Sequence, residues 1–224
     1  FGKQTYEFRM MDRLDWILAM IASICLVAHF MFWFHALDYT SVVSSVLFIA
    51  IHPIFVYIGT SFTLKHRLSA GVIISLCITV LGLAILYWGD AQLSQEHLLG
   101  NVLALIGAFF LGLSMITGHR IRKKISYTTY LWIIYGLGTG LLSIYLIINP
   151  HIAQVTLTPK TWVIIILLAV FPLIIGHVMA NFALRWLKIT TVSMGAGFEP
   201  IIAGILAYSI LDETIAPLHF LSGT

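Results

Sequence analysis

The most obvious pattern along the chain is the recurrence of apolar stretches that are separated by short polar segments. A helix needs about 20 apolar residues to cross a bilayer. Stretches such as VIIILLAVFPLII are apolar at every position, so they lack the alternation that is typical of a membrane β-strand. The pattern therefore predicts seven complete helical spans and the start of an eighth from Pro217. The complete spans are expected at residues 15–37, 41–63, 70–89, 98–118, 128–148, 162–184 and 190–211.

Composition supports this interpretation. Of the 224 residues, 60% are hydrophobic and 9% are charged, and the mean hydropathy is +0.99. These values are typical of an all-α, polytopic membrane helix bundle rather than of a soluble domain. The opening FGKQTYEFRMMDRLD has neither an initiator Met nor a signal-peptide pattern, so we interpret it as a loop within a longer protein. Cys25 and Cys77 fall inside predicted spans and show no disulfide or metal-binding spacing.

The basic residues are distributed unequally between alternate loops. Lys and Arg near membrane spans collect on the cytoplasmic side. Alternation of the predicted spans leaves Lys160 alone on one side. The other side holds Lys3, Arg9, Arg13, Lys65, Arg67, Arg120, Arg122, Lys123, Lys124, Arg185 and Lys188. We therefore expect an integral protein of the bacterial inner membrane, with the start of this chain in the cytoplasm and no nucleic-acid partner.

Two parts of the chain resemble each other weakly. At an offset of 147 residues the first two predicted spans align with the last two complete ones, so that Pro53 falls on Pro200 and His52 on Glu199. With one residue of slack, His29 also aligns with His177. A shift of five spans makes the two copies cross the membrane in opposite directions. The alignment thus predicts an inverted repeat, which is common in secondary transporters.

Several motifs resemble the EamA family of the drug/metabolite transporter superfamily. They are GHVMANFALRW, GFEPIIAGILAYSILDET, SSVLFIAIHPIFVYIG and GHRIRKK. The resemblance implies a ten-helix permease built from two five-helix inverted repeats, with both termini cytoplasmic. It divides this chain into residues 1–96, the remaining three spans of the first repeat, and residues 97–224, four spans of the second repeat plus the start of its last. The family resemblance also implies export of amino acids or similar metabolites.

Glu199 is the one acidic residue that lies deep in a predicted span. A charge at the bilayer centre costs at least about 2.5–3.5 kcal/mol, so such a residue is normally protonated, paired or turned toward a wet cavity. Helical geometry places the small residues Gly195 and Ala203 near Glu199, and bulky apolar residues on the opposite face. Glu199 is therefore a candidate for binding the substrate or a coupling proton, although a hydrogen-bonded structural role is the alternative.

Other polar residues and prolines fall at matching depths in the two copies. Pro53 and Pro200 each remove a helical hydrogen bond, and matched helix breaks point to transporter binding sites, although a packing kink is the alternative. Intramembrane histidines more often satisfy a structural hydrogen bond than carry protons. Their pairing through the repeat nevertheless favours a functional role. The further candidates for the substrate or proton pathway are His29, Trp33, His52, His177 and Asn181.

These features predict a permease that moves a small organic metabolite by alternating access through a midplane cavity. No GxxxxGK[ST] motif for nucleotide binding is present in the sequence, and we expect no enzymatic activity, metal or other cofactor. One alternative is an intramembrane metal-dependent enzyme that uses His29, His52, His177 and Glu199, but no HExxH motif occurs. The other is a retinal protein or receptor, although no Lys lies deep in a span.

Two segments bear on partners other than the substrate. The basic run HRIRKK predicts contact with anionic lipid headgroups at the cytoplasmic surface. In YGLGTGLL, Gly136 and Gly140 have the small-xxx-small spacing that allows membrane helices to approach closely. Membrane lipid is therefore an expected partner, and a homodimer is a candidate assembly.

Overall fold

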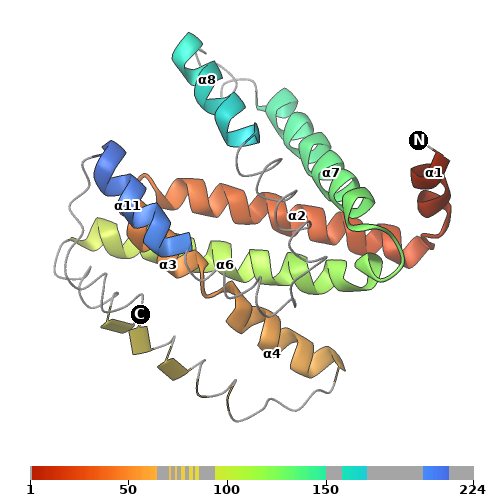
Figure 1. Cartoon of the computed structure of the whole chain (residues 1–224), viewed down its shortest axis with the longest axis horizontal. Helices are drawn as coiled ribbons and strands as arrows, with labels where there is room; N and C mark the ends of the chain where they lie inside the picture. The colour runs from red at the N-terminus through yellow and green to blue at the C-terminus, as the bar shows by residue number, and fades with distance from the viewer. Residues whose placement is uncertain are drawn as a thin grey trace. The chain divides into compact units, whose positions relative to one another are not determined.

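Figure 1 shows the computed structural model of the chain. It describes residues 2–64, 94–149, 158–170 and 199–211, together with isolated positions between 71 and 85. The helices in these residues are α1 (Gly2–Arg9), α2 (Arg13–Ala36), α3 (Val42–Ile49), α4 (His52–Leu64), α6 (Gln95–Arg122), α7 (Tyr127–Ile148), α8 (Pro159–Leu168) and α11 (Glu199–Leu211). The described residues contain no strand, and the expected all-α fold is confirmed.

The chain divides into two compact units. One consists of residues 1–143 with residues 200–224, and the other of residues 144–199. The described helix that lies wholly within the second unit is α8, which begins with Thr158 as its N-cap and Pro159 in its first turn. Both residues suit a helix start, because Thr accepts a free backbone N–H and Pro needs none. The large apolar side chains of α8 from Trp162 to Leu168 are all exposed.

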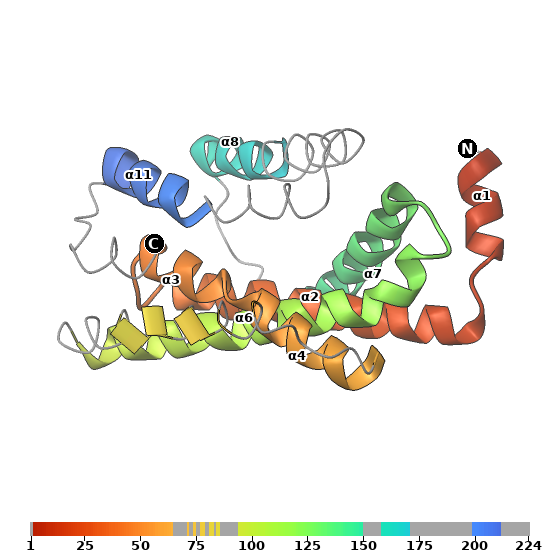
Figure 2. The same cartoon turned by 60° about the horizontal axis from the view of Figure 1, so that its bottom comes forward.

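The first unit is organised around α6, with α2, α3 and α4 packed against it. Helices α2 and α6 run antiparallel along each other, as Figures 1 and 2 show. At one end Arg120 of α6 contacts Asp12 and Asp15 at the start of α2. At the other end Thr40, just beyond α2, donates a hydrogen bond to Asn101 at 3.0 Å. These contacts fix the register of the two helices over their full length.

Small residues make most of the buried face of α6. A Cβ added to Gly100, Gly107 or Gly112 would lie 3.2 Å or less from an atom of a neighbouring segment, so each glycine permits an approach that a larger residue would block. The remaining buried residues of α6 are Asn101, Ala104, Ala108, Ser114, Gly118 and Ile121. Because lipid is as apolar as a side chain, such close packing is a main source of helix association in membranes.

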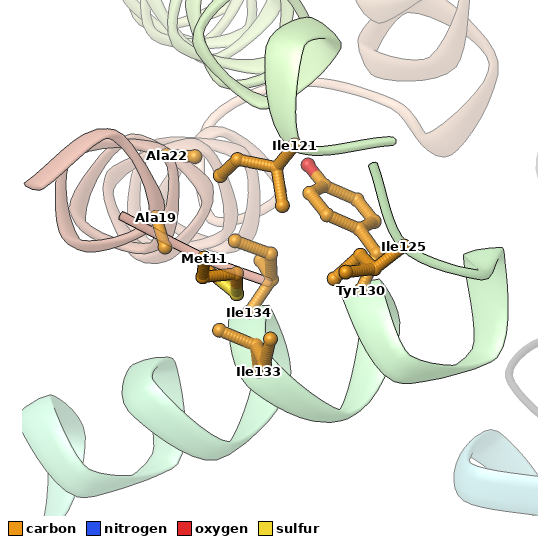
Figure 3. Packing of buried hydrophobic residues seen from close by; sticks show 8 residues of the cluster. All are labelled: Met11, Ala19, Ala22, Ile121, Ile125, Tyr130, Ile133 and Ile134. Atoms are coloured by element: carbon orange, nitrogen blue, oxygen red, sulfur yellow. The ribbon is translucent and has the colours of Figure 1, made fainter. Parts of the chain in front are cut away.

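A cluster of buried apolar side chains joins the first part of α2 to the end of α6 and the start of α7 (Figure 3). It consists of Met11, Ala19, Ala22, Ile121, Ile125, Tyr130, Ile133 and Ile134. Within it Ser23 donates a hydrogen bond to the carbonyl oxygen of Ile134 at 3.1 Å, which links α2 to α7. A second cluster near the other end of α2 includes Ala36, Leu47, Ala104 and Ala207.

The structure agrees with several predicted spans and differs from the sequence interpretation in two places. Helices α2, α6 and α7 match the spans at 15–37, 98–118 and 128–148 within four residues. The opening is not a loop, because residues 2–9 form α1. In α7, a Cβ added to Gly138 would lie 3.3 Å from Cγ2 of Val27, whereas a Cβ at Gly136 or Gly140 would meet no described atom within 4 Å. The predicted glycine contact is therefore displaced to the intervening glycine.

The other predicted spans are described in part. Span 41–63 consists of α3 and α4, and α8 and α11 cover parts of spans 162–184 and 190–211. Most of span 70–89 lies outside the described residues, as does the expected eighth span. Four described segments are long and apolar enough to cross a membrane. They are Arg13–Ala36, Val42–Gly59, Gln95–Arg122 and Tyr127–Ile148.

Candidate functional site

The candidate site lies where α2 and α4 cross the middle of α6. Gly107 of α6 sits against the backbone of α2, since its added Cβ would lie 3.4 Å from the carbonyl oxygen of His29. Gly112, further along α6, sits against α4, where its added Cβ would lie 2.8 Å from Cβ of Phe55 and 3.3 Å from the carbonyl oxygen of His52. The two glycines thus bring helices that carry His29 and His52 against the same neighbour.

His29 is buried, with 4% of its surface exposed. Its Nδ1 lies 3.0 Å from the carbonyl oxygen of Gly107. One turn further along α2, the indole ring of Trp33 stacks on the imidazole with a centroid separation of 5.8 Å and an interplanar angle of 21°. The imidazole is therefore held by α6 on one side and by its own helix on the other.

His52 lies at a helix interruption. Helix α3 ends at Ile49, α4 begins at His52, and Ala50 and Ile51 between them form a turn. Pro53 has no backbone N–H, so it cannot donate to the carbonyl oxygen of Ile49 in the manner of a regular helix. The Nδ1 atom of His52 lies 3.2 Å from that oxygen and replaces the missing donor. At the break, Pro53 thus leaves the carbonyl oxygen of Ile49 without its helical donor, and the ring of His52 supplies one.

Trp33 has a polar atom that is buried without a partner. The indole Nε1 makes no hydrogen bond in the part of the chain that the structure describes. An indole N–H is a donor only, and a buried donor that lacks an acceptor is costly. Its position next to His29 adds a second polar group with unused bonding capacity to the same region of α2.

The remaining predicted site residues are described only in part or not at all. His177 and Asn181 lie outside the described residues. Glu199 and Pro200 are the first described residues of α11, and the structure does not describe their side chains. The helix break predicted at Pro200 depends on the preceding turn, which lies outside the described residues. The structure therefore brings together His29, Trp33 and His52, while the grouping of all six polar candidates stays a prediction.

Two of the four ligands of the alternative metal site are described, His29 and His52. Both use Nδ1 to bind a backbone carbonyl oxygen, which leaves Nε2 as the nitrogen that could bind a metal. Among the described residues, no group of three or more His, Cys, Asp or Glu side chains is placed to hold a metal ion.

A second polar group lies at one end of the α2–α6 pair, and we call it the end cluster. It consists of Asp12, Asp15, Arg120 and Lys124. Arg120 bridges the two carboxylates, with Nη2 2.7 Å from Asp12 and Nε 2.9 Å from Asp15. Lys124 also pairs with both, at 3.0 Å from Asp12 and in a short contact with Asp15. Asp12 and Asp15 additionally cap the start of α2 by exchanging side chain to backbone hydrogen bonds.

The end cluster shifts the titration of its outer members. The backbone N–H of Asp15, the ammonium of Lys124 and the charge of Arg120 stabilise the ionised carboxylate of Asp12 and lower its pKa from 3.8 to about 2. Hydrogen bonds to Asp15 and Asp12 raise the pKa of Lys124 above its usual value. Sequence reasoning treated these residues as loop charges, and the DxxD pattern at the start of a span was the signal for the cap.

Glu7 of α1 is hydrogen-bonded to the residues at the start of α7. Its carboxylate accepts hydrogen bonds from the backbone N–H of Ser126 at 3.2 Å and from its hydroxyl at 2.7 Å. The hydroxyl of Thr129 donates to the same oxygen. These bonds cap the start of α7 and explain why the opening residues have a defined position as a helix.

Comparison with known families decides the identity. The model of the EamA-like transporter family matches residues 4–88 and 98–224. The chain belongs to the EamA-like transporter family. The family that the motifs resembled is thereby confirmed. Together with the four apolar segments of membrane length among the described residues, membership shows that this EamA-like chain belongs to an integral membrane protein.

Curated relatives of this EamA-like chain come from bacteria and an archaeon. An uncharacterised transporter of Synechocystis sp. is 24% identical over 98% of this chain and 66% of its own length. The uncharacterised transporter YxxF of Bacillus subtilis is 24% identical over 90% of this chain and 64% of its own length. An uncharacterised transporter of Archaeoglobus fulgidus is 21% identical over 84% of this chain and 65% of its own length. The chain thus spans slightly less than two thirds of these relatives, and no solved structure matches it.

Proposed function

We propose that the complete protein is a secondary transporter that exports a small organic metabolite, an amino acid or a similar compound, by alternating access. The relatives carry the name transporter without a stated substrate. The observation that carries the proposal is the placement of His29 and His52 on two helices that cross the glycines of α6, beside a helix break. Polar groups next to an interrupted membrane helix are typical of transporter binding sites.

Glu199, His177 and Asn181 complete the proposed site. Inverted repeats bring matching positions together at the midplane, and these residues match or neighbour the matches of His52 and His29. An ionisable group inside a membrane span is normally protonated, paired or turned toward a wet cavity, and the proposal assigns Glu199 the exchange of a proton during transport. His177 and Asn181 are four residues apart in the sequence, a spacing that puts two side chains on one face of a helix, and in the proposal they contact polar groups of the substrate.

The proposed orientation places the start of the chain in the cytoplasm of a bacterial cell. Support comes from α1, the start of α2 and the end of α6, which carry five Lys and Arg residues, and from Lys123 and Lys124 in the turn that follows α6. Basic residues collect on the cytoplasmic side. Single cysteines at Arg122 and Gln92, in a protein without Cys25 and Cys77, test this orientation. We expect an impermeant thiol reagent added to intact cells to label position 92 and not position 122, and equal labelling would contradict the topology.

The transport function is tested with the full-length protein in lipid vesicles. Vesicles are loaded with a panel of radiolabelled amino acids, and their efflux is measured with and without a proton gradient. We expect saturable efflux of at least one compound, which the gradient alters. Absence of efflux for every compound would contradict the assigned substrate class.

The matched variant for the proton role is Glu199→Gln, which keeps the size and hydrogen bonding of the side chain but cannot titrate. It should retain folding and lose the response of efflux to the proton gradient. If the variant folds and keeps the rate and the pH profile of the wild type, Glu199 is a structural residue and has no coupling role.

A further inference from the structure

The hydrogen bonds of His29 and His52 determine which ring nitrogen carries the proton. In each ring Nδ1 faces a backbone carbonyl oxygen, that of Gly107 for His29 and that of Ile49 for His52. A carbonyl oxygen has no proton to donate, so Nδ1 must be the N–H donor. A neutral imidazole has one N–H and one lone pair. Both neutral rings therefore carry their lone pair on Nε2.

Two unrelated backbone features produce this same tautomer. For His29 the acceptor belongs to a regular helix, α6, which Gly107 allows to lie against α2. For His52 the acceptor is the carbonyl oxygen that Pro53 cannot pair, next to the break between α3 and α4. Neither arrangement changes when Nε2 gains a proton, because both nitrogens are donors in the imidazolium ion. Each ring can thus gain and lose charge without breaking its bond to the backbone.

The described surroundings of the two rings contain no compensating carboxylate. The backbone of His29 lies against Gly107 of α6 and that of His52 against Gly112, and these two glycines are five residues apart on the same helix. Other titratable groups of α2 and α6 lie nearer the helix ends, except Cys25, and α7 contributes tyrosines. Helix α3 has none, α4 carries Tyr57 besides His52, and α11 carries Tyr208 and Glu199, whose carboxyl group is not described. The groups on α2 and α6 are Arg13, Asp15, Cys25, His35, Glu96, His97, His119, Arg120 and Arg122, and those on α7 are Tyr127, Tyr130, Tyr135 and Tyr145.

Two neighbouring positive charges away from water repel each other strongly, because the interaction energy rises as the effective dielectric constant falls. A second proton is therefore disfavoured once the first has bound. The two rings also differ in how well their surroundings stabilise the first proton. Trp33 stacks on His29 at 5.8 Å, within the distance of about 6 Å at which an aromatic ring attracts a cation. The described residues show no such ring contact for His52.

We propose that His29 and His52 form a proton-acceptor pair that binds one proton at Nε2, with His29 beside Trp33 as the preferred acceptor. The proposal rests on the transport function proposed above and specifies part of its site. The proton comes from water on whichever side the site faces, a new N–H bond forms at Nε2, and the same bond breaks when the proton is released. A proton bound in this way would be a carried charge in addition to the one assigned to Glu199.

The pair is tested by nitrogen-15 NMR of the full-length protein in lipid with labelled histidine, recorded between about pH 5 and pH 8. His29→Asn and His52→Asn assign the two rings and serve as variants. The Asn amide nitrogen takes about the position of Nδ1, so it can still donate to the carbonyl oxygen, but nothing replaces Nε2. We expect both neutral rings to show an unprotonated Nε2, and the wild-type pair to hold one imidazolium near the acid end. In each variant the remaining ring should still become an imidazolium.

The opposite tautomer in either ring, two imidazolium ions in the wild type, or no protonation at all would overturn the proposal. The last result would make the rings hydrogen-bond acceptors only. If an Asn variant fails to fold, His29→Gln and His52→Gln assign the rings, and the wild-type spectra decide the outcome. This measurement needs no transported compound. Failure of efflux with a protonated pair would therefore contradict the transport function and leave the pair intact.

Discussion

The end cluster and the two histidines differ in how their polar atoms are used. Asp15 is completely buried, and both of its carboxylate oxygens meet cations from α6 and the following turn. His29 and His52 are each bonded to the backbone through one nitrogen, and the second nitrogen is left to accept. Polar groups whose capacity is used within the chain fix a structure, whereas unused capacity is available to a ligand. This difference indicates a structural role for the end cluster and agrees with our proposal that the region of the two histidines serves transport.

The strongest test of this comparison removes the buried charge of the end cluster. Breaking a buried ion pair from one side costs about 3–5 kcal/mol, but Arg120 and Lys124 are 44% and 30% exposed, which reduces the penalty. For Asp15→Ala we expect the free energy of unfolding to fall by about 2–4 kcal/mol. Unfolding in mixed detergent measures it. The exposed Asp38→Ala is the control and should change little, and equal losses would show that burial of Asp15 is irrelevant.

The next test separates the site from the lipid-facing surface by means of two glycines. Gly107→Leu forces a side chain between α6 and the helices that carry Ile49 and His29, whereas the Cβ added by Gly136→Leu meets no described atom within 4 Å. We expect Gly107→Leu to destabilise by about 1–3 kcal/mol and to lose most efflux activity. Gly136→Leu should be close to wild type in both measurements. A reversed order would mean that Gly136 contacts a partner and that the packing at Gly107 is not needed.

A smaller effect is expected where a polar bond has a structural role alone. The hydroxyl of Ser114 on α6 donates to the carbonyl oxygen of Ala22 on α2 at 2.8 Å, and this bond involves neither histidine. Such bonds between membrane helices contribute about 0.6 kcal/mol on average. Ser114→Ala should lower the free energy of unfolding by about that amount without altering the pH profile of efflux. A changed pH profile would extend the functional region toward the end cluster.

The smallest expected effect is the acid response of Asp12. Its pKa is lowered to about 2 in the folded protein, from 3.8. A group with a lowered folded pKa stabilises above its unfolded pKa, and the contribution is lost as the pH falls through the folded value. The unfolding temperature should therefore decline between about pH 4 and pH 2. Asp12→Asn should show a shallower decline, and an identical decline would mean that Asp12 does not contribute.

Much of the helical framework could be predicted from sequence because length and apolarity are local properties. The bounds of α2, α6 and α7 follow from long apolar stretches between polar ends. Pro53 also marked the point where the structure interrupts its span. These features depend on residues that are near one another along the chain.

The remaining features depend on partners that are distant in sequence. Nothing near Asp15 indicates that Arg120, 105 residues later, will neutralise it. The spacing of Gly100, Gly107 and Gly112 indicates a close helix contact, but not that His29 and His52 will lie against it. Sequence reasoning selected both histidines from their depth and their repeat partners. It could not assign their tautomers, which depend on the position of two carbonyl groups.

The central claim is that the region of His29, His52 and Trp33 faces each side of the membrane in turn. It is tested most directly by placing a single cysteine at Trp33 in the full-length protein without Cys25 and Cys77, and by measuring its reaction with an impermeant thiol reagent added to either face of sealed vesicles. The account predicts labelling from both faces and protection by any amino acid whose efflux the protein supports. Labelling from neither face, or labelling that such an amino acid does not reduce, would contradict it.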